Sequence, residues 1–264
     1  MRVAFVSDVH GNLDALARVA DRAELLVVLG DLLDYVDYHD PSAGILGSIF
    51  GAEKVRIFAK LRAAGEFAAL AAYNRELWGT LADPHTVLHE EVSRRYRQVL
   101  AAVGPNTLLT LGNVDVVEAW NTIAGDVLPY RDGEAVTVGG VRFGFVAGGA
   151  TRPGRVIHRA NDAVWRPLVK PGDEYLDCVA AIGPVDVLCS HLPPRLAVMR
   201  YDTVAARLEA YGPGLLEAID QHRPWWALSG HVHQPLQARV RRGTTECVNV
   251  GHFQRTERPF ELSL

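Results

Sequence analysis

The sequence has few cysteines, no excess of positive charge and no long apolar run. Its three cysteines, Cys178, Cys189 and Cys247, form no CxxC pair, and such an odd, sparse set fits reduced thiols in a cytosolic protein. The formal net charge of −4 argues against a general electrostatic grip on long nucleic acid. No uncharged apolar run is long enough to span a bilayer, and no signal peptide precedes the first predicted strand. We therefore expect a cytoplasmic protein without a membrane partner.

The remaining composition is that of an ordinary globular protein. The chain has 264 residues, of which 48% are hydrophobic and 22% are charged. This length allows one large domain with a real core, with or without an insertion. We therefore treat residues 1–264 as a single domain.

Five short apolar runs each lead into a side chain that can bind a metal. The runs and their ligands are 3–7 with Asp8 and His10, 25–29 with Asp31, 107–111 with Asn113, 185–190 with His191, and 225–229 with His231 and His233. Each run has the length and residue types of a buried β-strand. Open α/β sheets place their sites at the carboxyl edge. If the runs share that edge, seven ligands converge there, which is too many for one ion with room for substrate and suits two.

The ligand types restrict the metal. Asp8 and His10 are two residues apart, so their side chains point the same way if strand geometry persists, and His231 and His233 repeat this spacing. The set contains imidazole, carboxylate and amide oxygen but no thiolate. Such a set favours two divalent ions such as Mn²⁺, Fe²⁺, Zn²⁺, Co²⁺ or Ni²⁺ over a closed structural zinc site.

Strands, ligand loops and helices alternate along the chain, which predicts an α/β fold. Asn12 is a plausible N-cap for a helix over 13–21. Gly139-Gly140 predicts a tight hairpin between two strands. The remaining predicted elements are helices at 173–182, 203–211 and 214–221, a hairpin at 236–250 and an edge strand at 260–264.

Residues 35–105 interrupt this alternation. We expect a loop at 35–51, an amphipathic helix over 53–79 that is broken at Gly65, and a second helix over 86–103. The segment reads as a helical insertion between two ligand-bearing strands. It could serve as a cap over the site or as a dimer arm, so a homo-oligomer is one expectation.

The ligand blocks resemble, in order, those of the calcineurin-like metallophosphoesterases. That family's blocks are D-x-H, G-D-x-x-D, G-N-H-D/E, x-H and G-H-x-H. The matching segments here are Asp8-Val9-His10, Gly30-Asp31-Leu32-Leu33-Asp34, Gly112-Asn113-Val114-Asp115, Ser190-His191 and Gly230-His231-Val232-His233. Each block alone is a weak signal, but five in order over residues 7 to 233 are specific.

The resemblance implies a fold of two β-sheets packed face to face as a sandwich flanked by helices. It also implies a ligand assignment. Asp8, His10 and His233 would hold one metal, Asn113, His191 and His231 the other, and Asp31 would bridge both. Such a pair of metals lowers the pKa of a shared water and clamps phosphate oxygens. A bridging hydroxide would then attack phosphorus, and the cations would offset the charge that develops on the phosphoryl oxygens.

One position departs from the family pattern. The third block normally has His after Asn, and this chain has Val114. The usual role of that His is to protonate the leaving oxygen or stabilise its charge, which valine cannot do. Either the substrate has a good leaving group or another acid substitutes, for which His39 and His252 are the candidates. The role of Asp115, which would normally support the missing His, is left open.

Several residues could contact the substrate or assist the site, and each also has a purely structural interpretation. Asn12 is either a helix cap or a neighbour of the phosphate. Arg152 and Arg195 either bind a substrate phosphate or belong to the solvated surface. Asp34 either orients a ligand or caps a turn.

The favoured function is hydrolysis of a small phosphate ester, most simply a phosphodiester such as a cyclic nucleotide or another nucleotide-type diester. A diester with a good leaving group asks less of a general acid, which suits Val114. The alternatives are a phosphomonoesterase or protein phosphatase, and a non-catalytic metal-binding scaffold. A nuclease for long nucleic acid is disfavoured by the acidic net charge.

Overall fold

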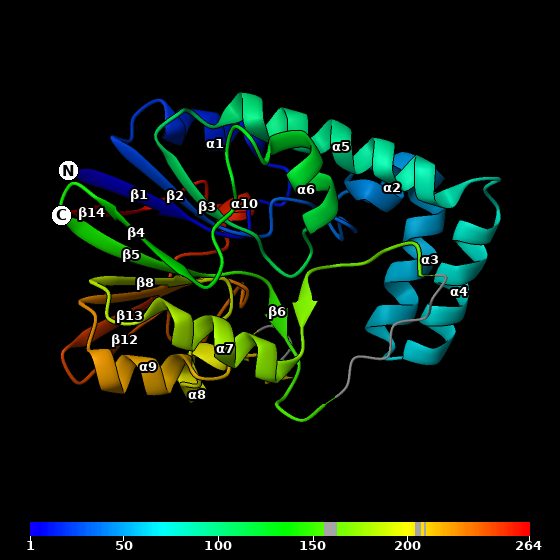
Figure 1. The fold of residues 1–264 in the computed structure, drawn as a ribbon. Coiled ribbons are helices and arrows are strands. Elements are labelled where there is room, and N and C mark those ends of the chain that lie inside the picture. Colours follow the sequence, from blue (N-terminus) through cyan, green and yellow to red (C-terminus); the bar gives the residue numbers. More distant parts are fainter. Residues whose placement is uncertain (156–162, 204–206, 209) are drawn as a thin grey trace.

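The computed structural model describes residues 1–155, 163–203, 207–208 and 210–264. Two β-sheets pack face to face, with helices on both outer faces (Figure 1). The first sheet has the strand order β14-β1-β2-β3. Its strands are β1 (Arg2–Val6), β2 (Leu25–Leu29), β3 (Thr107–Thr110) and β14 (Phe260–Ser263). The first three run parallel, and the predicted C-terminal strand pairs antiparallel with β1 at the sheet edge.

The second sheet has the order β12-β13-β11-β8-β5-β4. Its strands are β4 (Glu134–Val138), β5 (Val141–Val146), β8 (Val187–Ser190), β11 (Trp226–Ser229), β12 (Arg239–Arg242) and β13 (Thr245–Asn249). Neighbours among β5, β8, β11 and β13 are parallel, whereas β4 and β12 join the edges through the two predicted hairpins. Gly139 and Gly140 occupy the first turn with φ of 58° and 82°, which suits glycine.

Three hydrophobic layers explain why the predicted strands read as continuous apolar runs. Phe5 faces the second sheet, where its ring lies 6.5 Å from that of Phe143. Ala4 and Val6 face the other way and pack under helices. Because both faces of β1 are covered, alternation of polar and apolar residues is lost. The expected sandwich fold is therefore confirmed.

Helices cover both outer faces. Those over the first sheet are α1 (Leu13–Ala20), α5 (Pro84–Ala102) and α6 (Val117–Ala124). Those over the second sheet are α7 (Gly172–Ile182), α8 (Ala197–Arg200) and α9 (Leu215–His222). The short elements near the site are β6 (Gly149–Ala150), β7 (Val169–Lys170), β9 (Tyr201–Asp202), β10 (Arg207–Leu208) and α10 (Phe253–Thr256). No helix in the described ranges is long and apolar enough to cross a membrane.

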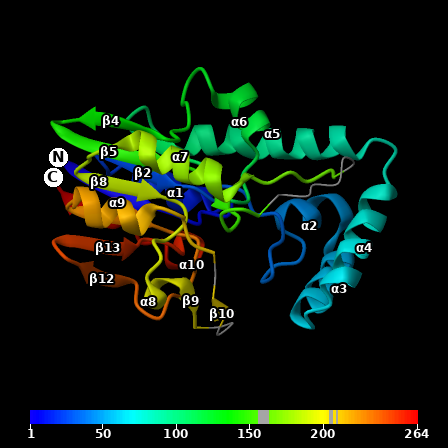
Figure 2. The ribbon, with the colours of Figure 1, turned by 60° about the horizontal axis from the view of Figure 1, so that its bottom comes forward.

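Residues 35–105 are helical over most of their length. The helices are α2 (Gly44–Phe50), α3 (Ala52–Ala63), α4 (Phe67–Gly79) and α5. The break at Gly65 is confirmed, with φ of 72° there. The α3–α4 pair extends away from the two sheets (Figure 2), whereas α5 packs on the first sheet through Val92, Tyr96 and Val99. The last helix is therefore part of the sandwich cover. A cap or dimer-arm role for the segment stays a prediction.

Two secondary-structure predictions were wrong. The loop expected at 35–51 contains α2, because Ile45 and Leu46 are fully buried in the apolar cluster under the helices. The helix expected at 203–211 falls partly outside the described residues, and Arg207–Leu208 there form β10, paired antiparallel with β9. Tertiary contacts outweighed local propensity in the first case.

Candidate metal centre

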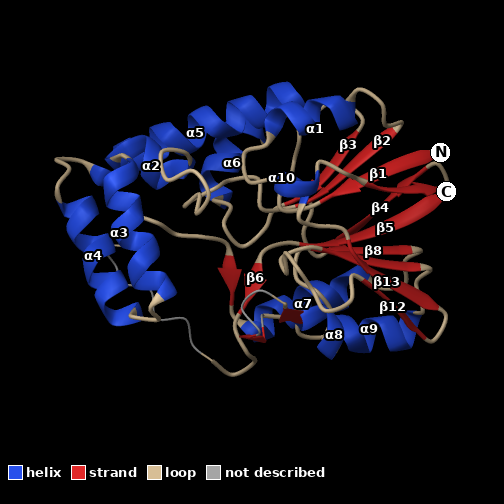
Figure 3. Cartoon of the chain, turned by 180° about the vertical axis from the view of Figure 1, so that it is seen from behind, coloured by secondary structure: helices blue, strands red, loops and turns tan. Residues whose placement is uncertain are grey.

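Strands of both sheets end near the middle of the molecule (Figure 3). The predicted ligands lie in segments that follow these strand ends, and they meet there. Among the described residues, two groups of side chains could each hold a metal ion. The first is Asp8, His10 and His233, and the second is Asp31, His191 and His231. Within each group, the candidate ligand atoms lie within 4.8 Å of one another.

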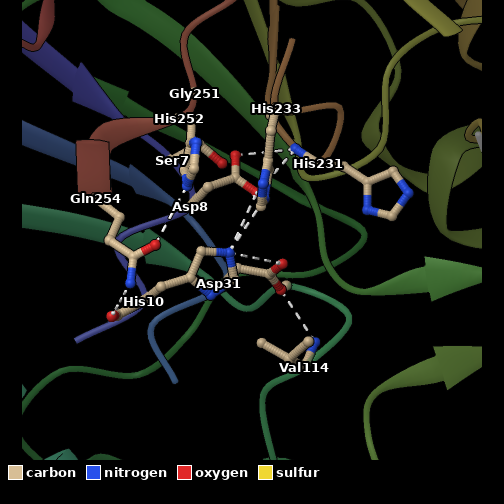
Figure 4. A network of polar contacts seen from close by, with 12 residues as sticks. Ser7, Asp8, His10, Asp31, Val114, His231, His233, Gly251, His252 and Gln254 are labelled. Carbon is tan, nitrogen blue, oxygen red and sulfur yellow. Dashed lines mark hydrogen bonds and ion pairs between the residues drawn. The ribbon is translucent and has the colours of Figure 1, made fainter. Parts of the chain in front are cut away.

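In the first group, Asp8 is the central residue (Figure 4). Its Oδ1 lies 3.4 Å from His233 Nε2 and 4.0 Å from His10 Nε2. The two imidazole Nε2 atoms are 3.2 Å apart. Three nitrogen and oxygen donors thus face one small volume, from the loops that follow β1 and β11, although His10 and His233 are 223 positions apart.

In the second group, Asn113 joins the residues that could hold an ion. Its Oδ1 lies 2.9 Å from His191 Nε2 and 2.7 Å from His231 Nδ1. His191 Nε2 is also 3.4 Å from Asp31 Oδ1. The structure therefore brings together all seven predicted ligands.

Asp31 lies between the two groups. Its Oδ1 faces His191, while its Oδ2 is 3.9 Å from His10 Nε2 in the first group. Oδ1 also accepts a hydrogen bond of 3.0 Å from the backbone N–H of Val114. This bond fixes the carboxylate so that one oxygen is presented to each group.

Backbone carbonyls orient two of the imidazoles. His10 Nδ1 donates to Leu33 O at 2.9 Å, and His191 Nδ1 donates to Leu29 O at 2.9 Å. With the proton on Nδ1, each Nε2 carries a free lone pair toward the site, which is the tautomer a metal requires.

The convergence of Asp8 and His10 has a different cause from the predicted one. Strand β1 ends at Val6, and both residues have positive φ, 57° for Asp8 and 41° for His10. Strand alternation therefore does not align them. Asp31 and His231 also have positive φ, 53° and 67°. Left-handed backbone at four of the seven ligands is the strain that a preformed site stores.

Glycines next to the ligands allow the loops to approach each other. A Cβ on Gly112 would lie 2.8 Å from Asp31 Cγ, and closer still to Asp31 Oδ1 and backbone N. A Cβ on Gly30 would lie 2.5 Å from Gly112 Cα. Only glycine fits either position, which is the physical reason for the glycine before Asp31 and before Asn113.

Asp115 binds the ligand loops together, which answers the question that the sequence left open. Its Oδ1 accepts backbone N–H bonds from Leu32 at 3.1 Å and Leu33 at 3.2 Å, and its Oδ2 accepts one from Gly112 at 2.8 Å. The side chain is fully buried. Asp115 therefore positions the loops of Asp31 and Asn113 without needing a histidine at position 114.

The electrostatics fit a cation. Burial would raise the pKa of Asp8, but its hydrogen bond with His233 and the neighbouring histidine charges hold that pKa well below its usual value. Burial would lower the pKa of His191, but Asp31 and Asp8 raise it to about 9. The metal-free site thus needs positive charge beside its carboxylates. A divalent cation would supply that charge and release protons.

The other predicted catalytic and substrate residues differ in whether they lie near the ligands. His252 adjoins the first group, its ring stacked on that of His233 at 3.9 Å between centroids and 16° between planes. His39 is exposed on the loop after β2, where its backbone N–H donates to Asp37. Asn12 caps α1 by accepting from Ala15 N at 3.4 Å. The structure therefore brings His252, but not the His39 side chain, to the ligands.

Arg152 and Arg195 are both exposed and lie in loops that follow site elements. Arg152 follows β6, and Arg195 follows His191 by four residues. The guanidinium of Arg195 lies 5.7 Å from the centre of the Tyr211 ring. Both residues are thus exposed, in segments that adjoin site elements, whereas Asp8, Asp31 and His191 are buried.

Two residues that hold the site were not predicted. Asn249 Nδ2 donates to Gly230 O at 3.0 Å and Val232 O at 2.9 Å, which fixes the loop of His231. Gln254 Nε2 donates to His10 O at 3.1 Å. Asn249 had a signal in the sequence, because it ends an apolar strand just as the ligands do. Gln254 lies in a short helix and had none.

Comparisons with known proteins agree with the motifs. Residues 1–235 match the family model described as calcineurin-like phosphoesterase, so the predicted resemblance is confirmed. One solved structure aligns with a TM-score of 0.58 at 18% identity, over 96% of this chain and 91% of that chain, which supports the fold alone. Another, described as a novel archaeal phosphodiesterase, aligns over 100% of both chains with a TM-score of 0.37 at 10% identity. That score is too low to support an inference. No curated protein matches significantly.

Proposed function

This chain belongs to the calcineurin-like phosphoesterase family, and from that premise we propose that it is a dinuclear metal-dependent phosphodiesterase. Its substrate is a small nucleotide-type diester, such as a cyclic nucleotide. The coarser function, metal-dependent hydrolysis of a phosphate ester, follows from the family and the candidate ligand groups. The observation that carries the dinuclear proposal is Asp31, whose two oxygens face different ligand groups.

The ligand assignment follows the two groups. Asp8, His10 and His233 would hold one ion, Asn113, His191 and His231 would hold the other, and Asp31 would offer one oxygen to each. Two bound divalent ions would lower the pKa of a water molecule and neutralise phosphoryl oxygens.

The protein's own residues supply the preorganisation. Asp115 holds two ligand loops, the Leu33 and Leu29 carbonyls orient His10 and His191, and burial excludes water from the carboxylates. Because these groups are fixed by backbone contacts, little reorganisation accompanies the reaction.

Val114 supports a diester over a monoester. Its backbone N–H holds Asp31 while its side chain packs against the apolar cluster of the first sheet, so no proton donor occupies the position next to Asn113. A diester with a stable leaving group needs less help from an acid than a monoester with an alkyl leaving group. His252, stacked on His233, is the nearest described imidazole outside the ligand set that could donate a hydrogen bond.

The test is hydrolysis of matched chromogenic substrates, p-nitrophenyl phosphate and bis(p-nitrophenyl) phosphate. Metal-stripped protein is supplemented with Mn²⁺, Fe²⁺, Zn²⁺ or Mg²⁺. We expect metal-dependent cleavage that favours the diester, is abolished in Asp31→Asn and is unchanged in Asp126→Asn, which removes an exposed carboxylate. Equal turnover of the two esters would refute the diesterase assignment. No turnover with any metal would favour the scaffold alternative.

A further inference from the structure

A cluster of arginines gathers around one tyrosine beside the candidate metal centre. The Arg200 guanidinium carbon lies 4.0 Å from the centre of the Tyr211 ring, and that of Arg195 lies 5.7 Å from the same centre. Arg152 is the third member; it lies in the segment that directly follows β6, and its charge, like that of Arg195, lowers the pKa of Arg200. We call Arg152, Arg195, Arg200 and Tyr211 the arginine cluster.

The arginines of the cluster repel one another electrostatically. Burial, together with the charges of Arg195 and Arg152, lowers the pKa of Arg200. Within the described residues, the buried Nε of Arg200 has no hydrogen-bond partner. Buried guanidinium donors usually bind a carboxylate or phosphate, and cation–π contacts with one ring only partly offset the repulsion of like charges. The arrangement has the hydrogen-bond donors and the positive charge that bind an anion.

Three chain connections place the cluster beside the second ligand group. Arg195 lies four residues after His191. The turn after Tyr211 is fixed to the same loop, since Gly212 N donates to Pro193 O at 3.0 Å. Arg152 lies three residues after Gly149, whose added Cβ would be 3.0 Å from Asn113 Cβ.

Arg200 is tied to the loop of the remaining ligands. It ends α8 and is followed directly by β9. Tyr201 O accepts from Leu236 N at 3.1 Å, and Thr203 N donates to Gln234 O at 2.8 Å, so this strand runs along the segment that follows His233. Each arginine of the cluster therefore lies on a segment that continues or contacts a different ligand-bearing loop.

The cluster lies outward from the ligands. Arg152 and Arg195 are exposed, whereas Asp31 and His191 are buried. Metal ions bound there would offset the charge of a phosphoryl group held between the two ligand groups. The guanidinium donors of the cluster remain available for a different anionic group of the same molecule.

We propose that the arginine cluster binds a second phosphoryl group of the substrate, beyond the one that the metal centre cleaves. The effect of the cluster on hydrolysis rests on the proposed function. Binding of an anion by the cluster does not. The substrate class narrows to nucleotide esters that carry a further phosphate. Guanidinium and phosphate match in geometry and charge, whereas a neutral nucleoside offers the guanidinium groups no negative charge to pair with.

The first test is independent of hydrolysis. Calorimetry on metal-free protein measures binding of inorganic pyrophosphate and orthophosphate to wild type, Arg195→Gln, Arg200→Gln and Arg97→Gln. Arg97 is an exposed arginine of α5 and serves as the matched control. We expect pyrophosphate to bind about tenfold more weakly to either cluster variant, and unchanged to the control. Arg195 is exposed, so its variant keeps the test valid if Arg200→Gln fails to fold. Equal weakening in Arg97→Gln, or none in Arg195→Gln, overturns the proposal.

The second test is kinetic and uses metal-loaded protein. The substrates are thymidine 5′-(p-nitrophenyl phosphate) and the same ester with a 3′-phosphate. We expect wild type to have the higher kcat/KM for the 3′-phosphorylated ester, and Arg195→Gln to lose most of that preference. An unchanged preference refutes the subsite. If wild type cleaves neither ester, the proposed hydrolysis fails, while the calorimetry still decides whether the cluster binds phosphate.

Discussion

Gly112→Ala should weaken both the fold and the metal centre, because the new side chain would push apart the loops of Asp31 and Asn113. The new Cβ would lie 2.8 Å from Asp31 Cγ, and nearer to Asp31 Oδ1 and backbone N. Backbone N cannot rotate away, so the loops of Asp31 and Asn113 must move apart. That movement would also stretch the 2.8 Å bond from Gly112 N to Asp115 Oδ2.

The cost can be estimated from these contacts. Overpacking of a tight core costs roughly 1–3 kcal/mol, occasionally more. Loss of a hydrogen bond to a charged, buried acceptor costs about 1.5–3 kcal/mol. Since both occur together, we expect the free energy of unfolding to fall by about 2.5–6 kcal/mol. Affinity for the second metal should fall too, because Asp31 and Asn113 flank the displaced backbone.

The chain offers a matched control in Gly104→Ala. An added Cβ at Gly104 meets nothing within 4 Å, and replacing glycine by alanine at an unstrained position changes stability by at most about 1 kcal/mol. Urea unfolding of the metal-free proteins gives the free energies, and titration with Mn²⁺ or Zn²⁺ gives the affinities. Gly112→Ala with the stability and affinity of Gly104→Ala would refute the steric reasoning.

Three further predictions concern Val114, His252 and Asp34. Val114→His should restore a proton donor beside Asn113 and raise the turnover of monoesters relative to diesters, by on the order of 10²-fold if the new histidine acts as a general acid. An unchanged ratio in paired assays would contradict the idea that the enzyme lacks a general acid because of Val114. His252→Phe keeps an aromatic ring beside His233 and removes the nitrogens, so diesters with alkyl leaving groups should slow more than p-nitrophenyl diesters; equal slowing indicates a packing role only. Burial raises the pKa of Asp34 to about 6 from 3.8, so the folded metal-free protein binds this proton more tightly than the unfolded chain and loses stability as pH rises from about 4 to about 6. Asp34→Asn should therefore gain up to about 3 kcal/mol at pH 7.5 and less at pH 4.5 in urea unfolding; a gain independent of pH would contradict the assignment.

The strands and their ligands could be predicted because each signal is local. A five-residue apolar run such as Leu25–Leu29 is buried on both faces, and its end fixes where Asp31 enters the site. Parallel pairing then brings these ends to one edge. The division of these strands between two packed sheets was predicted only from the resemblance to the calcineurin-like metallophosphoesterases, because local signals do not say which strands pair.

Other features depend on contacts between distant segments. Arg200 and Tyr211 are separated by residues that include undescribed positions, and no periodicity links them to Arg152. The α2 helix forms because Ile45 and Leu46 find a buried surface made by other elements. Left-handed φ at Asp8 and His10 is likewise imposed by tertiary contacts, including the bonds from Asp8 N to Gly30 O and from His10 N to Asp31 O.

Asp115 explains how this chain can lack the family's histidine and keep its ligand geometry. In this structure the carboxylate accepts bonds from the backbone of Leu32, Leu33 and Gly112, and position 114 contributes a backbone N–H to Asp31. Both contacts are independent of the side chain at 114. Proton donation and metal binding are therefore separable here, so Val114→His should change the leaving-group dependence of hydrolysis while the metal affinity stays within about threefold. A large change in affinity would mean that position 114 sets the ligand geometry and that Asp115 does not.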